Sequence, residues 1–197
     1  AFAYGGVFPG TLHAKGVLHK THDVNYSIGA AGTYLMHVGL RQLSAILPGS
    51  PFVLQVKPGP AHAQSTALPQ ELLPLESIVG TGGKLSLQLR DGLGNACIEG
   101  DAPLQVAINQ KVTAKCEDQE DGTYLISWGG KESGVFSMSV TLQGVHVRGS
   151  PASLTMHAAE LFIEKCELSS SEKAAVAGVP ERLQIVCRDT FGNDAEP

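Results

Sequence analysis

Apolar and polar residues alternate in several short stretches of this chain, and each stretch ends at turn-forming residues. Leucines occupy every second position of 85–89, and apolar residues do the same in 52–56, 124–128 and 136–142. In a β-strand such residues all point to one face. Turn pairs such as Asp91-Gly92 follow these runs, and no segment combines a helical period with helix caps. The pattern predicts an all-β fold of short antiparallel strands packed as a sandwich.

Three motifs recur along the chain at nearly the same spacing. Residues 83–95 contain KLSLQLRDGLGN and residues 182–193 contain RLQIVCRDTFGN, and both end in Arg-Asp-x-x-Gly-Asn. Gly-Ser-Pro at 49–51 returns at 149–151, and GTYLMHV at 32–38 is echoed by GVFSMSV further along. The copies lie about 100 positions apart, which is the size of a whole immunoglobulin-like domain. The chain is therefore expected to contain tandem copies of one sandwich.

The positions of the motifs predict one complete repeat flanked by two partial ones. Residues 1–58 are expected to be the C-terminal part of a repeat, residues 60–157 a complete repeat, and residues 158–197 the N-terminal part of a third. A partial repeat cannot close a sandwich by itself, so we expect the flanks to expose apolar faces and unpaired strand edges. Exchange of the flanks between molecules is an alternative way to cover them.

Composition and motif content argue against several classes of function. A net charge of −5 and a pI near 5.8 do not suit a protein that binds nucleic acid by neutralising phosphates. No apolar run approaches the roughly 20 residues that span a bilayer. The chain has no Gly-x-Ser-x-Gly elbow, no Walker A motif and no Gly-x-Gly-x-x-Gly loop. We expect a non-catalytic protein without a cofactor.

Two polar clusters contain residue types that can bind metal ions. His19-x-x-His22-Asp23 has a spacing that does not put ligands on one face of a strand. The acidic run Glu117–Asp121 lacks the calcium-loop pattern of an EF-hand. Both clusters are predicted to be solvated surface rather than metal ligands.

The ordered motifs resemble the filamin-type (filamin/ABP280) immunoglobulin-like repeat. DGTYLISW at 121–128 is followed by GVFSMSV at 134–140 and then by HVRGSP at 146–151, while ILPGSPFVLQV at 46–56 matches the last strand of the same pattern. Ala152 stands where the family usually has Phe. The actin-binding calponin-homology domain of filamins is not within this chain. Contact with actin would therefore be indirect or made by regions outside it.

The resemblance implies seven strands in the complete repeat, namely A around 75–80, B at 84–90, C at 103–109, D at 111–117, E at 123–128, F at 135–142 and G at 151–157. It also implies a binding mode in which an extended peptide adds to strand C in the groove between C and D. Small Ala107 would leave room on that face. The candidate residues are Leu104, Val106, Ala107, Ile108, Val112 and Ala114. The alternative is an ordinary edge protected by its neighbours.

The cysteines suggest two disulfide pairs. If C and D are antiparallel neighbours, Cys97 before C lies near Cys116 at the end of D. Cys166 in strand A and Cys187 in strand B of the third copy meet in the same way. Two bridges would indicate an oxidising compartment. The alternative is free thiols in the core, since Cys187 takes the inward position of Leu89.

Two classes of function follow from the resemblance. One is a cytoplasmic, actin-cytoskeleton-linked scaffold whose repeats serve as spacers and docking sites for protein partners. The other is an extracellular or cell-surface adhesion and recognition protein, similar to gamete-adhesion proteins, in which disulfides brace filamin-like repeats. The redox state of the cysteines would distinguish the two.

Overall fold

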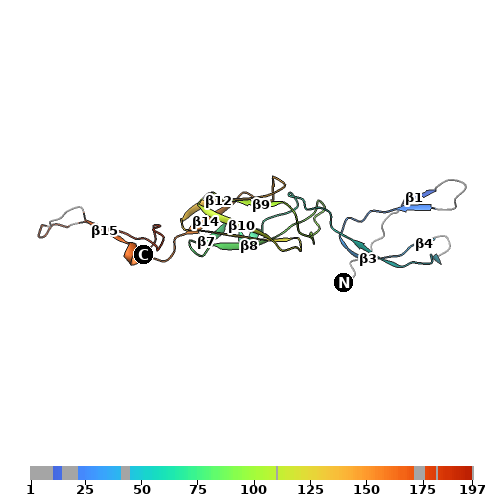
Figure 1. Ribbon diagram of the computed structural model, residues 1–197, viewed down its shortest axis with the longest axis horizontal. Coiled ribbons are helices and arrows are strands. Elements are labelled where there is room, and N and C mark those ends of the chain that lie inside the picture. The colour runs from blue at the N-terminus through green and yellow to red at the C-terminus, as the bar shows by residue number, and fades with distance from the viewer. Residues whose placement is uncertain are drawn as a thin grey trace.

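The computed structural model describes residues 11–14, 22–40, 45–109, 111–170, 176–180 and 182–196. A central sandwich carries hairpins of the N-terminal segment at one end and a hairpin of the C-terminal segment at the other (Figure 1). Within the described residues the helical elements are two 3-10 turns, η2 (Gln70–Leu72) and η3 (Ile163–Lys165). The predicted all-β sandwich is confirmed.

One sheet of the sandwich has three antiparallel strands. β11 (Thr123–Gly130) lies in the middle, between β8 (Gly83–Gln88) and β10 (Val112–Asp118). Every second side chain of β11 is buried, so this strand presents one face to the core. Trp128 belongs to that face, and its indole N–H donates a hydrogen bond to Ser77 Oγ at 3.1 Å.

The second sheet is built around β12 (Gly134–Leu142). β14 (Ala152–His157) pairs with the first half of β12, and β13 (Val145–His146) pairs with its end. On the opposite side β9 (Leu104–Ala107) pairs with residues 139–142, and β7 (Leu75–Ile78) runs parallel to β14. The strand ranges implied by the family resemblance agree with these seven main strands to within a few residues.

The core lies between the two sheets. Leu154, Ile126 and Leu89 are fully buried, and Tyr124 and Trp128 fill the space beside them. Gly83 sits against the Trp128 ring, where an added Cβ would come within 2.4 Å of Cζ2. The leucines that alternate with polar residues in 85–89 are buried, as their spacing predicts.

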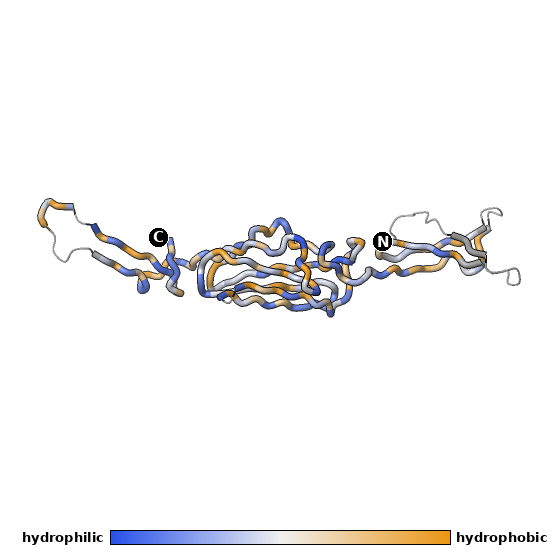
Figure 2. Tube along the Cα trace, turned by 90° about the horizontal axis from the view of Figure 1, so that it is seen from above, coloured by the Kyte–Doolittle hydropathy of each residue, from blue (hydrophilic) through white to orange (hydrophobic). Residues whose placement is uncertain are grey.

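The flanking segments form two-stranded sheets that are separate from the sandwich. The N-terminal segment contains the hairpins β1 (Thr11–Ala14) with β2 (His22–Asn25), β3 (Gly32–Met36) with β6 (Phe52–Val56), and β4 (Gly39–Leu40) with β5 (Ala45–Ile46). The C-terminal segment pairs β15 (Glu167–Ser170) with β16 (Leu183–Val186). Hydrophobic residues are spread along these ladders (Figure 2). The side chains of Val53, Leu168 and Ile185 are exposed.

The Gly-Ser-Pro motifs recur in three dimensions as well as in sequence. Ser50 Oγ accepts a hydrogen bond from the Val38 N–H, and Ser150 Oγ accepts one from the Val140 N–H, both at 2.7 Å. The preceding Gly149 has a φ of 84°, in the left-handed region that favours glycine. The serine therefore holds the same neighbouring strand in both copies.

Shortening a core side chain should cost far more stability than shortening an exposed one. Leu154 is fully buried on β14, so Leu154→Ala should lower the free energy of unfolding by about 2–5 kcal/mol. Val135 on β12 is 72% exposed, and Val135→Ala should stay within about 0.5 kcal/mol. Urea denaturation followed by Trp128 fluorescence measures both. Equal losses would contradict the core assignment.

Candidate peptide-binding edge

The outer edge of β9 carries unpaired backbone groups. The Gln143 N–H donates to Pro103 O at 3.3 Å, so Pro103 and Gln143 form a hydrogen-bonded pair next to the β9–β12 ladder. Hydrogen-bonded and non-hydrogen-bonded pairs alternate along an antiparallel ladder. Gln105 and Ala107 therefore bond to β12, whereas the N–H and C=O groups of Val106 point away from it. Within the described residues no strand pairs with this outer edge. An extended chain could use these groups as an added ladder.

The side chains of the candidate residues divide between the core and the surface. Leu104, Val106 and Ile108 are half-buried and pack against the core, while Ala107 is exposed. Val112 is buried inside the sandwich, so its side chain cannot line a surface groove. Ala114 is half-buried on β10. Ala107 is thus the candidate whose side chain faces solvent.

β9 and β10 are outer strands of two different sheets. β9 pairs with β12, and β10 pairs with β11. The expectation that strands C and D are antiparallel neighbours in one ladder is therefore wrong. Within the described residues each of the two strands lies at the edge of its own sheet.

A hydrogen-bonded clasp joins the start of β9 to the other sheet. Tyr124 Oη accepts a bond from the Ala102 N–H and donates one to Asp118 Oδ2, both at 2.8 Å. Asp118 Oδ2 also accepts the Asp101 N–H at 2.6 Å. Asp101 has a φ of 64°, a strained value for a non-glycine residue. The clasp therefore fixes where β9 begins relative to the end of β10.

The protonation states of this clasp suit its hydrogen bonds. Burial, together with the bond to Asp118, raises the pKa of Tyr124 to about 12, so the phenol keeps its proton. Backbone hydrogen bonds from Glu120 and Asp101 lower the pKa of Asp118 below its usual value. At neutral pH Asp118 is a carboxylate that accepts and Tyr124 is a phenol that donates.

A cavity adjoins the start of the edge. The linker 57–61 and the segment 97–103 line a volume of about 340 Å³, together with Leu142 and Gln143. Lys57 Nζ and Glu99 Oε1 form an exposed ion pair at 3.0 Å among these lining residues. The cavity is thus shared between the linker and the approach to β9.

The cysteines do not form the suggested bridges, because all four are free thiols in the structure. Cys97 N–H bonds to Leu89 O beside β8, while Cys116 lies opposite Ile126 on β11. The expected meeting of this pair depended on a C–D ladder that is not formed. Cys166 and Cys187 do flank one ladder, but Cys166 Sγ donates to the Phe162 carbonyl at 3.5 Å.

Other candidate chemistry is sparse. His19 lies outside the described residues, and within the described part no three His, Cys, Asp or Glu side chains gather as a metal site. Likewise, no described helix has the length and hydropathy needed to cross a membrane. In the acidic run, Asp121 Oδ1 accepts the Thr123 N–H at 2.9 Å and so shapes a turn.

Comparison with known sequences identifies the central part of the chain. Residues 60–153 match the family model of the filamin/ABP280 repeat. The human E3 ubiquitin-protein ligase TRIM45 is 36% identical over 72 residues, a match that covers 34% of this chain and 12% of the ligase. The resemblance inferred from the motifs is confirmed.

Comparison with solved structures finds the same fold in bacterial proteins that include an adhesin and an integrin-binding protein. FdeC, an adhesin of Escherichia coli, has a TM-score of 0.55 at 17% identity and matches over 82% of this chain and 52% of its own. InvD of Yersinia pseudotuberculosis has a TM-score of 0.55 at 19% identity, and the match covers 95% of this chain and 60% of the InvD chain. Invasin, a bacterial integrin-binding protein, gives 0.54 at 16% identity, over 89% and 35%. At these identities the likeness concerns fold alone.

The clasp should be measurable as stability and local order. Tyr124→Phe removes the hydroxyl that links Ala102 to Asp118, so we expect a loss of about 1–3 kcal/mol in the free energy of unfolding. The Ala102 amide should also exchange faster with solvent. Urea denaturation and amide exchange by NMR test both effects. Unchanged exchange at Ala102 would contradict the clasp.

Proposed function

Because residues 60–153 belong to the filamin/ABP280 repeat family, we propose that this chain is a protein-binding module that accepts an extended peptide along β9. The observation that carries the proposal is the outer edge of β9, where the backbone groups of Val106 point away from β12. Added backbone hydrogen bonds would supply affinity, and alternate side chains of the peptide would supply specificity. Repeats of this family and the adhesin-like sandwiches are non-catalytic domains, which fits a binding role.

The surroundings of β9 suggest what kind of peptide would fit. Ala107 is small and exposed, so a bulky peptide side chain can lie over it without a clash. The clasp of Tyr124 and Asp118 holds the start of the edge and reduces the ordering that binding requires. A peptide with alternating apolar and polar residues in an extended conformation is the proposed ligand class.

We place the module in a cytoskeletal scaffold, as the family suggests. In this role the repeats act as spacers and docking sites, and contact with actin is indirect or made by regions outside the chain. The proposed location is the cytoplasm. A reducing compartment, where disulfides are rare, is consistent with the four unbridged cysteines of the structure.

A second candidate is cell-surface adhesion. It is supported by the likeness of fold to FdeC, InvD and invasin, which extends over most of this chain. The version braced by disulfides is not supported, because the four cysteines are free. An adhesive function would have to use the same edge without those bridges.

A charge placed on the edge should weaken peptide binding without unfolding the protein. Peptides selected by the chain from a displayed library of random 12-residue sequences serve as the probe. Ala107→Asp is expected to weaken a selected peptide at least tenfold, because a carboxylate would be desolvated under the added strand. Isothermal titration gives the affinities, and NMR should show slower exchange at the Val106 amide when peptide binds.

Ser153→Asp is the matched control for this experiment. Ser153 is exposed on β14 in the same sheet, away from the β9 edge. The control should bind like the unmodified chain. Equal weakening by both variants, or peptide-induced shifts confined to other strands, would count against strand addition at β9.

The thiols provide a separate test of compartment. We expect all four cysteines to be alkylated by iodoacetamide in denaturant without prior reduction, as intact mass would record. In the folded chain Cys97 should react slowly, because burial raises the pKa of its thiol and shields it. Protein from a secretory expression route that resists alkylation until reduced would favour the adhesion candidate.

A further inference from the structure

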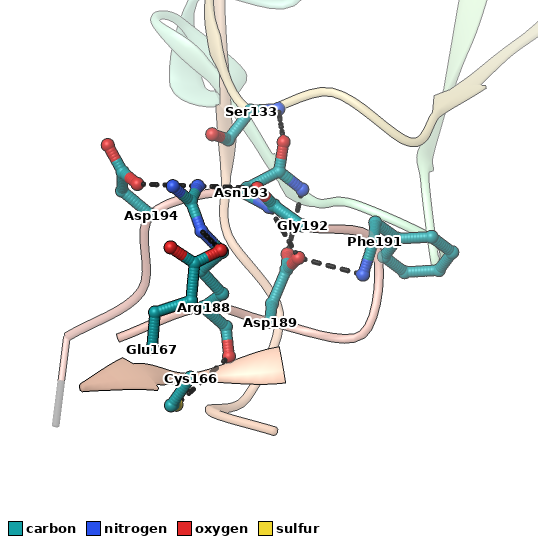
Figure 3. Close-up of polar contacts among 9 residues, drawn as sticks. All are labelled: Ser133, Cys166, Glu167, Arg188, Asp189, Phe191, Gly192, Asn193 and Asp194. Carbon is teal, nitrogen blue, oxygen red and sulfur yellow. Dashed lines mark hydrogen bonds and ion pairs between the residues drawn. The ribbon is translucent and has the colours of Figure 1, made fainter. Parts of the chain in front are cut away.

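The two Arg-Asp-x-x-Gly-Asn loops have the same internal hydrogen bonds. Asp91 Oδ1 accepts the backbone N–H groups of Leu93 and Asn95, at 2.9 and 2.8 Å. Asp189 Oδ1 accepts those of Phe191 and Asn193, both at 2.8 Å (Figure 3). Each aspartate therefore closes its own loop.

The other carboxylate oxygen of each aspartate holds the linker to the preceding segment. Asp91 Oδ2 accepts the Gly59 N–H at 2.9 Å, and Asp189 Oδ2 accepts the Ala159 N–H at 3.0 Å. Hydrogen bonds from the Asn95 side chain and Gly59 lower the pKa of Asp91 to about 2. Burial works to raise the pKa of Asp189, but its hydrogen bonds outweigh burial and lower it to about 2. Both carboxylates are charged at neutral pH.

The asparagine that ends each loop reaches across to the preceding unit. Its side-chain oxygen accepts a backbone N–H, and its amide nitrogen donates to a backbone carbonyl two residues earlier. Asn95 makes these bonds to the Ala31 N–H and Gly29 O, both at 2.9 Å, and Asn193 makes them to the Ser133 N–H at 2.9 Å and Lys131 O at 3.0 Å. The same amide nitrogen also donates to the loop's own aspartate, at 2.8 Å in each copy. This bond fixes the direction in which the asparagine points.

The two receiving turns occupy the same place in their units. Ala31 directly precedes β3, and Ser133 directly precedes β12. β3 pairs with β6 as β12 pairs with β14, so these strands correspond. Each loop therefore docks on the turn that leads into the corresponding strand of the unit before it. The recognised groups are main-chain groups and require no particular side chain.

The two junctions differ in their apolar contact. Phe191 lies directly on Gly80, where a Cβ would stand only 2.6 Å from its ring. The equivalent Leu93 is 74% exposed, and its Cδ1 would be 3.8 Å from a Cβ on Gly29. Burial of apolar area at the second junction is therefore greater.

We propose that the Asp-x-x-Gly-Asn loop is a docking surface for the preceding repeat, and that Phe191 makes the second junction stiffer than the first. The partner is the backbone of the turn that precedes β12, or of the turn that precedes the corresponding strand β3. The aspartate holds the linker, and the asparagine makes the contact with the preceding turn. The residue two positions after the aspartate, Leu93 or Phe191, determines how stiff the junction is. This role is separate from peptide binding at β9.

The asparagine contact is tested by amide exchange in the full chain. Asn193→Ala should speed exchange of the Ser133 amide by roughly 3–10-fold, the effect of losing one hydrogen bond. Asn109→Ala is the matched control, because Asn109 Oδ1 accepts the nearby Lys111 N–H within a local turn. The control should leave Ser133 unchanged. Free exchange of the Ser133 amide in the unmodified chain would overturn the proposal.

The stiffness claim is tested by a pair of equivalent substitutions that leave the polar bonds in place. Phe191→Ala should reduce the residual dipolar couplings of residues 182–196 toward those of an independently tumbling segment. Leu93→Ala, at the matching position, should change those of residues 22–40 little. Similar effects of the two substitutions, or none from Phe191→Ala, would overturn the assignment of stiffness to Phe191.

Discussion

The buried carboxylates of Asp91 and Asp189 organise the chain beyond their own loops. Each accepts four hydrogen bonds, from two loop amides, one linker amide and one asparagine side chain. A buried carboxylate without donors would be very costly, so the charge holds all four groups in place. One side chain thus determines where a sandwich starts, how the linker enters it and where the asparagine points.

Most of the fold could be predicted from the sequence, because a strand that is buried on one face has an apolar residue at every second position. Leu85, Leu87 and Leu89 are all buried, as their spacing predicts. The same alternation does not determine which strands pair, since every strand of a sandwich alternates. For this reason the predicted ladder between strands C and D was wrong, and the contact of Cys97 with Cys116 that depended on it is not formed.

The candidate sites were readable only in part. Ala107 was singled out for its size and is exposed, whereas Val112 lies inside the core. The recurrence of Arg-Asp-x-x-Gly-Asn was visible, but its docking role was not. Its partners are main-chain groups of Ala31 and Ser133, which lie 64 and 60 residues away in sequence. Recognition of the backbone leaves no pattern of side chains in the sequence.

The linker of the first junction and the segment that leads into β9 line the same cavity. The Gly59 N–H is held by Asp91, and the linker residues around Gly59 line the same cavity as Pro103, which leads into β9. A shift of this linker would therefore change the shape of the space beside the start of the edge. The second junction is made instead with the turn between β11 and β12, and Lys131 and Ser133 of that turn do not line this cavity. Because Leu93 is largely exposed, the junction beside the edge is also the one with the weaker apolar contact. The linker around Gly59 is thus common to the first junction and to the cavity beside β9, whereas the apolar contact of Phe191 with Gly80 is separate from that cavity.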